Sequence, residues 1–103
     1  PQQVCIIPIS DELNDYCNEL ETELKLNNIR VKTDSRTITM QSKIRDAEQN
    51  KIPYMLIIGK REKDASSVSL RYRGQKQNIV LPNSELISKI LDNIKQRKLD
   101  IVL

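Results

Sequence analysis

The chain contains no histidine, phenylalanine or tryptophan, and only two glycines. Without histidine it lacks the side chain most often used in general acid–base catalysis and a frequent zinc ligand. Two glycines are too few for a glycine-rich phosphate loop, and no acidic metal cluster is visible. We therefore expect no catalytic residue, no metal and no cofactor within this chain, which on its own should not be catalytic.

Cysteine is almost as scarce. Cys5 and Cys17 stand twelve positions apart, which matches no common spacing of metal ligands. A disulfide between them stays open, but two reduced, buried thiols fit a cytosolic-type protein better. We accordingly expect a cytoplasmic location and no redox function.

Aromatic residues are limited to three tyrosines, so the core must be built from leucine, isoleucine and valine. The 103 residues, 38% of them apolar, suit one compact domain over 1–103. No apolar run approaches the length of a membrane span, and no membrane partner is expected. Because the chain begins at Pro1 rather than at methionine, we expect it to be a fragment of a longer protein.

Charge is distributed unevenly along the chain. Residues 1–28 hold six acids and one lysine, a net charge of −5, whereas residues 29–103 hold sixteen basic and eight acidic residues, a net charge of +8. Such sorting is typical of a protein that binds a polyanion. Composition alone is equally compatible with charges that simply solvate the surface.

Apolar periodicity predicts alternating strands and helices. Strands are expected over 4–9, 29–33, 54–58, 68–72 and 79–81. Three helices are expected: one capped by Ser10 with Leu13, Tyr16, Cys17, Leu20 and Leu24 inward, one on Met40, Ile44 and Ala47, and one after Pro82 with Leu86, Ile87, Ile90, Leu91 and Ile94 inward. Asn27-Asn28 should end the first helix, and Gly74 should mark a turn. The order β-α-β-α-β-β-β-α predicts a three-layer α/β/α fold with a mixed five-stranded sheet.

The carboxyl ends of parallel strands are where such sheets usually bind ligands. Here these ends lead into residues 34–39 and 59–63, and we expect both segments to be loops. Residues 30–76 hold twelve basic and five acidic residues. Those flanking the two loops would provide a basic surface for phosphates: Arg30, Lys32, Arg36, Lys43, Arg45, Lys60, Arg61 and Arg71.

Glu62 and Arg71 suggest a way to select a base. A carboxylate can accept the N1–H and N2–H of guanine, and a guanidinium can donate to its O6 and N7. An ordinary Glu62–Arg71 ion pair at the surface explains the same residues. The lack of phenylalanine and tryptophan disfavours RNA binding by aromatic stacking, and Tyr54 and Tyr72 are both compatible with the core.

Several motifs resemble one family. The segments Lys43-Ile44-Arg45-Asp46-Ala47, Pro53-Tyr54-Met55-Leu56-Ile57-Ile58-Gly59 with Glu62 following, and Val68-Ser69-Leu70-Arg71-Tyr72-Arg73 are similar to the C-terminal anticodon-binding domain of threonyl-tRNA synthetase. Asp34 and Arg36 fit the D-x-R element before the second helix. The resemblance extends from Pro1 to about Lys98 and implies a class IIa anticodon-binding fold.

The resemblance also implies a function. The family reads G and U at the second and third anticodon positions of threonine tRNA. By residue-for-residue transfer, Glu62 and Arg71 would read the guanine, Arg45 would face the anticodon loop, and Thr37 would lie on the uracil side. Arg36, Lys43 and Arg61 complete the expected anticodon-binding set.

Other implications concern the parent enzyme, a threonine–tRNA ligase. Its ATP, magnesium and zinc sites would lie in a catalytic core outside this chain, and the full-length enzyme would be a homodimer although the fragment would be a monomer. Thr37 and Thr39 stand where the family commonly has asparagine and lysine, and Gln41-Ser42 replaces the usual glycine. An interaction or dimerisation module of the same fold is therefore the alternative. A receiver-like domain fits less well, because no acidic cluster follows the first strand.

Overall fold

The computed structural model describes the backbone of residues 2–102 and the side chains of residues 2–95. Its elements are β1 (Val4–Pro8), the short 3₁₀ helix η1 (Asp11–Leu13), α1 (Asn14–Leu26), β2 (Val31–Thr33), α2 (Met40–Gln49), β3 (Tyr54–Ile58), α3 (Lys60–Asp64), β4 (Ser67–Tyr72), β5 (Asn78–Pro82) and α4 (Asn83–Val102). No described helix is both long and apolar enough to cross a membrane.

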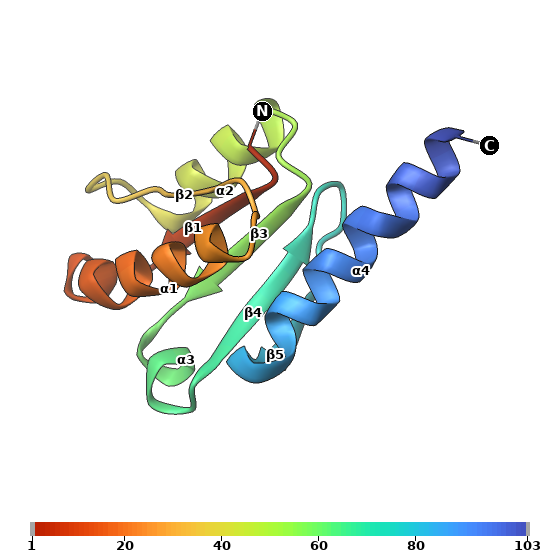
Figure 1. Cartoon of the computed structure of the whole chain (residues 1–103). Coiled ribbons are helices and arrows are strands. Elements are labelled where there is room, and N and C mark those ends of the chain that lie inside the picture. The colour runs from red at the N-terminus through yellow and green to blue at the C-terminus, as the bar shows by residue number, and fades with distance from the viewer. Residues whose placement is uncertain (1, 103) are drawn as a thin grey trace.

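The strands form one sheet in the order β2-β1-β3-β4-β5. β1 runs parallel to β2 and β3, whereas β4 is antiparallel to both β3 and β5. Helices α1 and α4 cover one face and α2 lies on the other (Figure 1). The predicted three-layer fold with a mixed five-stranded sheet is therefore confirmed.

Burial on both faces explains the uninterrupted apolar runs of the central strands. Val4 and Ile6 of β1 pack towards α1 and α4, while Cys5 and Ile7 pack towards α2. β3 alternates in the same way, and all five of its residues are buried. Tyr54 belongs to the core, where its ring meets the ring of Tyr72 edge-on at 5.6 Å.

Both cysteines are free and buried on opposite sides of the sheet, as expected for reduced structural thiols. Burial raises the pKa of Cys5 to about 11 and that of Cys17 to about 12. Both thiols therefore stay protonated at neutral pH, which makes them poor nucleophiles.

The two expected chain reversals are also confirmed. Asn28 follows α1 with a φ of 63°, the left-handed conformation that asparagine tolerates. Gly74 has a φ of 84° in the turn between β4 and β5.

Several local predictions were wrong. The charged residues after Ile58 form the helix α3 rather than a loop, and five residues are too few to show a helical period. β2 begins at Val31 rather than Ile29, and Ile9 lies beyond the end of β1 with 49% of its surface exposed. Leu91 is 38% exposed because α4 turns only the stripe of Leu86 and Ile90 fully inward.

Helix α2 leaves part of its sheet face open. Its apolar residues pack on β1 and β3, at Cys5, Ile7, Met55 and Ile57. Across the sheet the register continues from Ile57 to Ser69 and Val80, and from Met55 to Arg71 and Asn78. We refer to Ser69, Arg71, Asn78 and Val80 as the open sheet face; Val80 is 65% exposed there.

Candidate functional site

A hollow lies where the open sheet face meets the carboxyl end of β3. Its volume is about 390 Å³, and its lining residues are Ile9, Met40, Ile57, Gly59, Lys60, Arg61, Glu62, Ser69 and Asn78. This size falls in the lower range of small-molecule pockets. The hollow combines an apolar floor with charged and amide groups at its rim.

Glu62 is held in place at one end of this hollow. Its Oε1 accepts a hydrogen bond from the Gly59 N–H at 2.7 Å, so the side chain caps the start of α3. Oε2 has no hydrogen-bond partner among the described residues. A β-carbon at position 59 would lie 3.0 Å from Oε1 and 2.9 Å from Ile9 Cδ1, so glycine permits this close arrangement.

Arg71 lies on the same face of the sheet, two residues along β4 from Ser69. Its Nη2 is 3.9 Å from Glu48 Oε1 at the end of α2, a loose ion pair. The side chain keeps 21% of its surface exposed, and its Nε is buried without a partner. The buried Nε therefore fixes the base of the guanidinium, and another part of the group faces solvent.

Glu62 and Arg71 do not form an ion pair with each other. Residues two apart on a strand are about 7 Å apart, and Ser69 lies between Arg71 and the end of the hollow that Glu62 occupies. The simple surface ion pair considered from the sequence is thus not formed. Glu62 lies on α3 at the hollow, and Arg71 lies on the open sheet face beyond Ser69.

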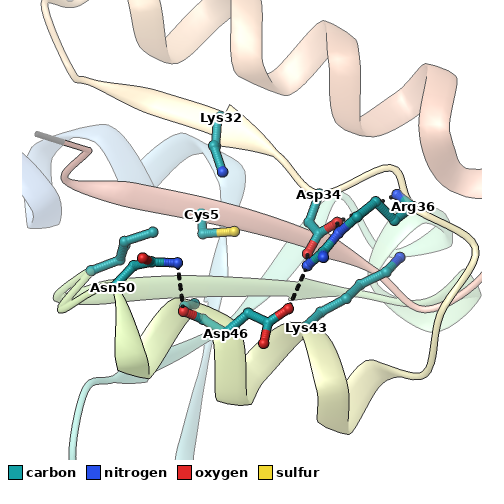
Figure 2. A pocket seen from close by; sticks show the side chains of 9 residues that line it. Cys5, Lys32, Asp34, Arg36, Lys43, Asp46 and Asn50 are labelled. Atoms are coloured by element: carbon teal, nitrogen blue, oxygen red, sulfur yellow. Dashed lines mark hydrogen bonds and ion pairs between the residues drawn. The ribbon is translucent and has the colours of Figure 1, made fainter.

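Arg36 is engaged by carboxylates. Its Nε donates to Asp34 Oδ1 at 2.8 Å, and its Nη2 donates to Asp34 Oδ2 at 2.7 Å and to Asp46 Oδ2 at 2.8 Å. Figure 2 shows the guanidinium between the two acids, one from the segment after β2 and one from α2. The hydrogen bonds from Arg36 lower the pKa of Asp34, and those to the two acids raise the pKa of Arg36. The D-x-R element therefore ties a loop to a helix.

Lys43 requires a correction. Its side chain is only 2% exposed, and its Nζ donates to the Pro8 carbonyl oxygen at 3.0 Å. A direct contact between this ammonium group and RNA is inconsistent with that burial. Lys43 instead connects α2 to the end of β1.

The two threonines that depart from the family pattern are also engaged internally. The Thr37 hydroxyl donates to Asp11 Oδ2 at 3.1 Å. Thr39 caps α2 and accepts from the Ser42 N–H at 3.1 Å. Thr37 remains exposed, whereas the Thr39 hydroxyl serves the helix.

Arg45 and Arg61 are both exposed. Arg61 lines the hollow from α3. Arg45 is three residues before Glu48, so the two share one face of α2, and Glu48 approaches Arg71. Glu62 and Arg61 thus line the hollow, Arg71 lies on the neighbouring open sheet face, and Arg45 lies on α2.

A second cavity, of about 280 Å³, lies between β2 and α2 and contains the Arg36 cluster. Figure 2 shows Cys5 at its floor and Lys32 above it. No group of three metal-ligating side chains occurs among the described residues. The cavity's acids already serve Arg36.

Three residues near the hollow were missed from the sequence. Ser69 and Asn78 line it, and Glu48 meets Arg71. Alternation along β4 could have identified Ser69. Asn78 lies in a polar stretch with no motif, and only the pairing of β4 with β5 places it opposite Arg71.

Comparisons with known proteins agree with this architecture. Residues 3–93 match the family described as anticodon binding domain. A threonine–tRNA ligase of Dehalococcoides mccartyi is 42% identical over 101 residues, which is 98% of this chain and 17% of the relative. One from Deinococcus radiodurans is 43% identical over 100 residues, which is 94% of this chain and 15% of the relative. The chain thus spans about a sixth of the length of these relatives.

Two solved structures from Cryptosporidium parvum are similar as well. The RNA binding domain of threonyl-tRNA synthetase has a TM-score of 0.85 at 30% identity, covering 89% of this chain and 23% of that one. Prolyl-tRNA synthetase, complexed with halofuginone and AMPPNP, has a TM-score of 0.84 at 33% identity, covering 93% of this chain and 21% of that one. The shared architecture therefore does not by itself distinguish these two enzymes.

Proposed function

From the premise that this chain belongs to the family of anticodon binding domains, we propose that it is the anticodon-reading part of a threonine–tRNA ligase. The curated relatives at 42% and 43% identity are threonine–tRNA ligases, and this supports the proposal. The two solved structures do not separate the enzymes, because the threonyl one shares 30% and the prolyl one 33%. The proposed parent enzyme joins threonine to its tRNA with ATP, magnesium and zinc in a core outside this chain. The family resemblance supports a homodimeric parent enzyme in the cytoplasm and threonine tRNA as the partner.

Within this proposal, Glu62 and Arg71 read the guanine at the middle anticodon position. The observation that carries the proposal is that Glu62 lines the hollow together with Ser69 and Asn78, which are the neighbours of Arg71 on the open sheet face. Glu62 offers an oriented carboxylate to the N1–H and N2–H of the base, and Arg71 offers donors to its opposite edge. Neither group has to break a close ion pair with the other.

The remaining residues have supporting tasks. Arg61 at the hollow and Arg45 on α2 are exposed cations and would contact phosphates, which position RNA without selecting a base. Thr37 is exposed and would contact the uracil through its hydroxyl once Asp11 releases it. Arg36 and Lys43 act indirectly, since their contacts hold the segment after β2 and the start of α2 in place.

The test is a titration with anticodon stem-loops of threonine tRNA, native or changed at the middle base. Arg71→Ala should remove about 1–3 kcal/mol of discrimination in favour of guanine. Few phosphate contacts are available, so binding should be weak. Because these contacts are ionic, binding should also fall as salt rises. If Arg71→Ala weakens every RNA equally, the assigned role is wrong.

One observation favours the alternative, an interaction or dimerisation module without anticodon reading. The hydroxyl groups of Thr37 and Thr39, which replace the usual asparagine and lysine, are both used inside the chain. Such a module would show no preference for the native stem-loop over one changed at the middle base. Tight binding that ignored ionic strength would likewise contradict the proposed mode of recognition.

A further inference from the structure

Asn78 lies next to Arg71 without any known role. It begins β5 and pairs directly with Arg71 of β4, so both side chains leave the same face of the sheet. Asn78 is exposed, lines the hollow that Glu62 also lines, and has no side-chain hydrogen bond to any described residue. An unengaged carboxamide therefore faces the space where the guanine would lie.

Arg71 cannot easily supply two donors to one base edge. Its Nε is buried, which rules out the side-on arrangement that uses Nε and Nη2. Its Nη2 lies 3.9 Å from Glu48 Oε1. This attraction disfavours the end-on arrangement, in which both terminal nitrogens donate to the base. Guanine has two acceptors on that edge, O6 and N7. Arg71 satisfies one of them well and leaves the other for a second donor.

The hollow places Asn78 where this second donor is needed. Glu62 lies at the α3 end, and Asn78 lies across it on β5, with Ser69 of β4 between them. A guanine whose N1–H and N2–H face Glu62 presents N7 on its far side. That side faces β5 and Arg71.

We propose that the Asn78 carboxamide donates a hydrogen bond to N7 of the guanine held between Glu62 and Arg71. This inference rests on the proposed anticodon-reading function and adds a residue that the sequence motifs do not identify. Asn78 then shares the far edge of the base with Arg71. Selection of guanine depends on β5 as well as on α3 and β4.

The test removes N7 and Asn78 separately and together. Stem-loops carrying guanosine or 7-deazaguanosine at the middle anticodon position are titrated at low ionic strength into the wild-type chain, Asn78→Ala and Asn78→Asp. Loss of N7 should weaken binding to the wild type by about threefold to tenfold, the range expected for one hydrogen bond. Asn78→Ala should weaken native binding by a similar factor and become insensitive to the deaza base, whereas Asn78→Asp should bind more weakly still.

Asn18→Ala is the matched control, because Asn18 is an exposed asparagine on α1, over the other face of the sheet. It should behave as the wild type. Unchanged thermal unfolding of both alanine variants would show that they fold. The inference is overturned if Asn78→Ala binds native RNA normally and still responds to the deaza base.

The same titrations separate this failure from failure of the proposed function. A wild-type chain that prefers guanine at the middle position, combined with an Asn78→Ala variant that keeps its deaza response, rejects Asn78 alone. A wild-type chain without any preference among middle bases, or without binding, rejects both.

Discussion

The sheet face on which α2 lies has a half that α2 covers and a half that is open. Similar charged residues lie around both halves, but their contacts differ. In the covered half, beneath and beside α2, Lys43 is buried against a carbonyl and Arg36 is held by two carboxylates. In the open half, Arg71 has only a loose ion pair, and Asn78 and one oxygen of Glu62 lack partners among the described residues. Charges in the covered half connect elements, and those in the open half remain available to a ligand.

The largest effect that tests this contrast is expected from replacing Lys43. Lys43→Ala should lower the free energy of unfolding by about 2–4 kcal/mol, because it removes a buried side chain and the donor to the Pro8 carbonyl. Lys43→Met keeps much of the buried stem and should cost about half as much. Urea unfolding measures both.

Lys89→Ala, an exposed lysine on α4, is the control and should change stability little. Guanine preference per folded molecule should persist in Lys43→Met. A loss of that preference without loss of stability would return Lys43 to the RNA-contacting set.

The Asp34–Arg36 pair should add an acid-dependent term to stability. Arg36 holds the pKa of Asp34 below its usual range, so this stabilisation is present above the unfolded pKa of about 3.9 and is lost as pH falls through the lower folded value. Asp34→Asn should cost about 1–2 kcal/mol at neutral pH, a modest amount because Arg36 is largely exposed.

As pH decreases, the free energy of unfolding should therefore fall less steeply for Asp34→Asn than for the wild type. Asp92→Asn, at an exposed position on α4, provides the comparison and should keep the wild-type slope. Parallel curves for all three proteins would show that the pair contributes nothing in acid.

Glu48 gives the smallest effect and tests its ion pair with Arg71, which joins the two halves. Glu48→Gln should change stability by less than about 0.5 kcal/mol, since the pair is loose and partly exposed. The preference for guanine should fall by less than about threefold, because Arg71 loses the group that orients it. Overall affinity should not fall, since the change removes a negative charge near phosphates. An unchanged base preference would mean that Glu48 does not orient Arg71.

Local pattern predicted most of the fold because the longer elements each carry their own period. The α1 stripe, the buried run of β3 and the Asn28 reversal depend on near neighbours in the chain. Lys43 could have been recognised in the same way, since it stands three residues after Met40 and four before Ala47 on the buried side of α2. Its charge favours a surface position, but a buried lysine is tolerated when its ammonium group has a hydrogen-bond partner.

Glu62 and Arg71 were identified from the sequence through a motif and through the chemistry of guanine. Their separation was not predictable, because it depends on the antiparallel register of β3 and β4. The same applies to Asn78, which reaches Arg71 only through the pairing of β5.

The order of strands and helices, the composition of the core and the family all follow from the amino-acid sequence alone, because they depend on side-chain period and on short motifs. Which cations are paired and which are free was decided only by tertiary structure. A charge acquires its role from groups that lie far away in the chain, and these meet it only when the sheet has formed.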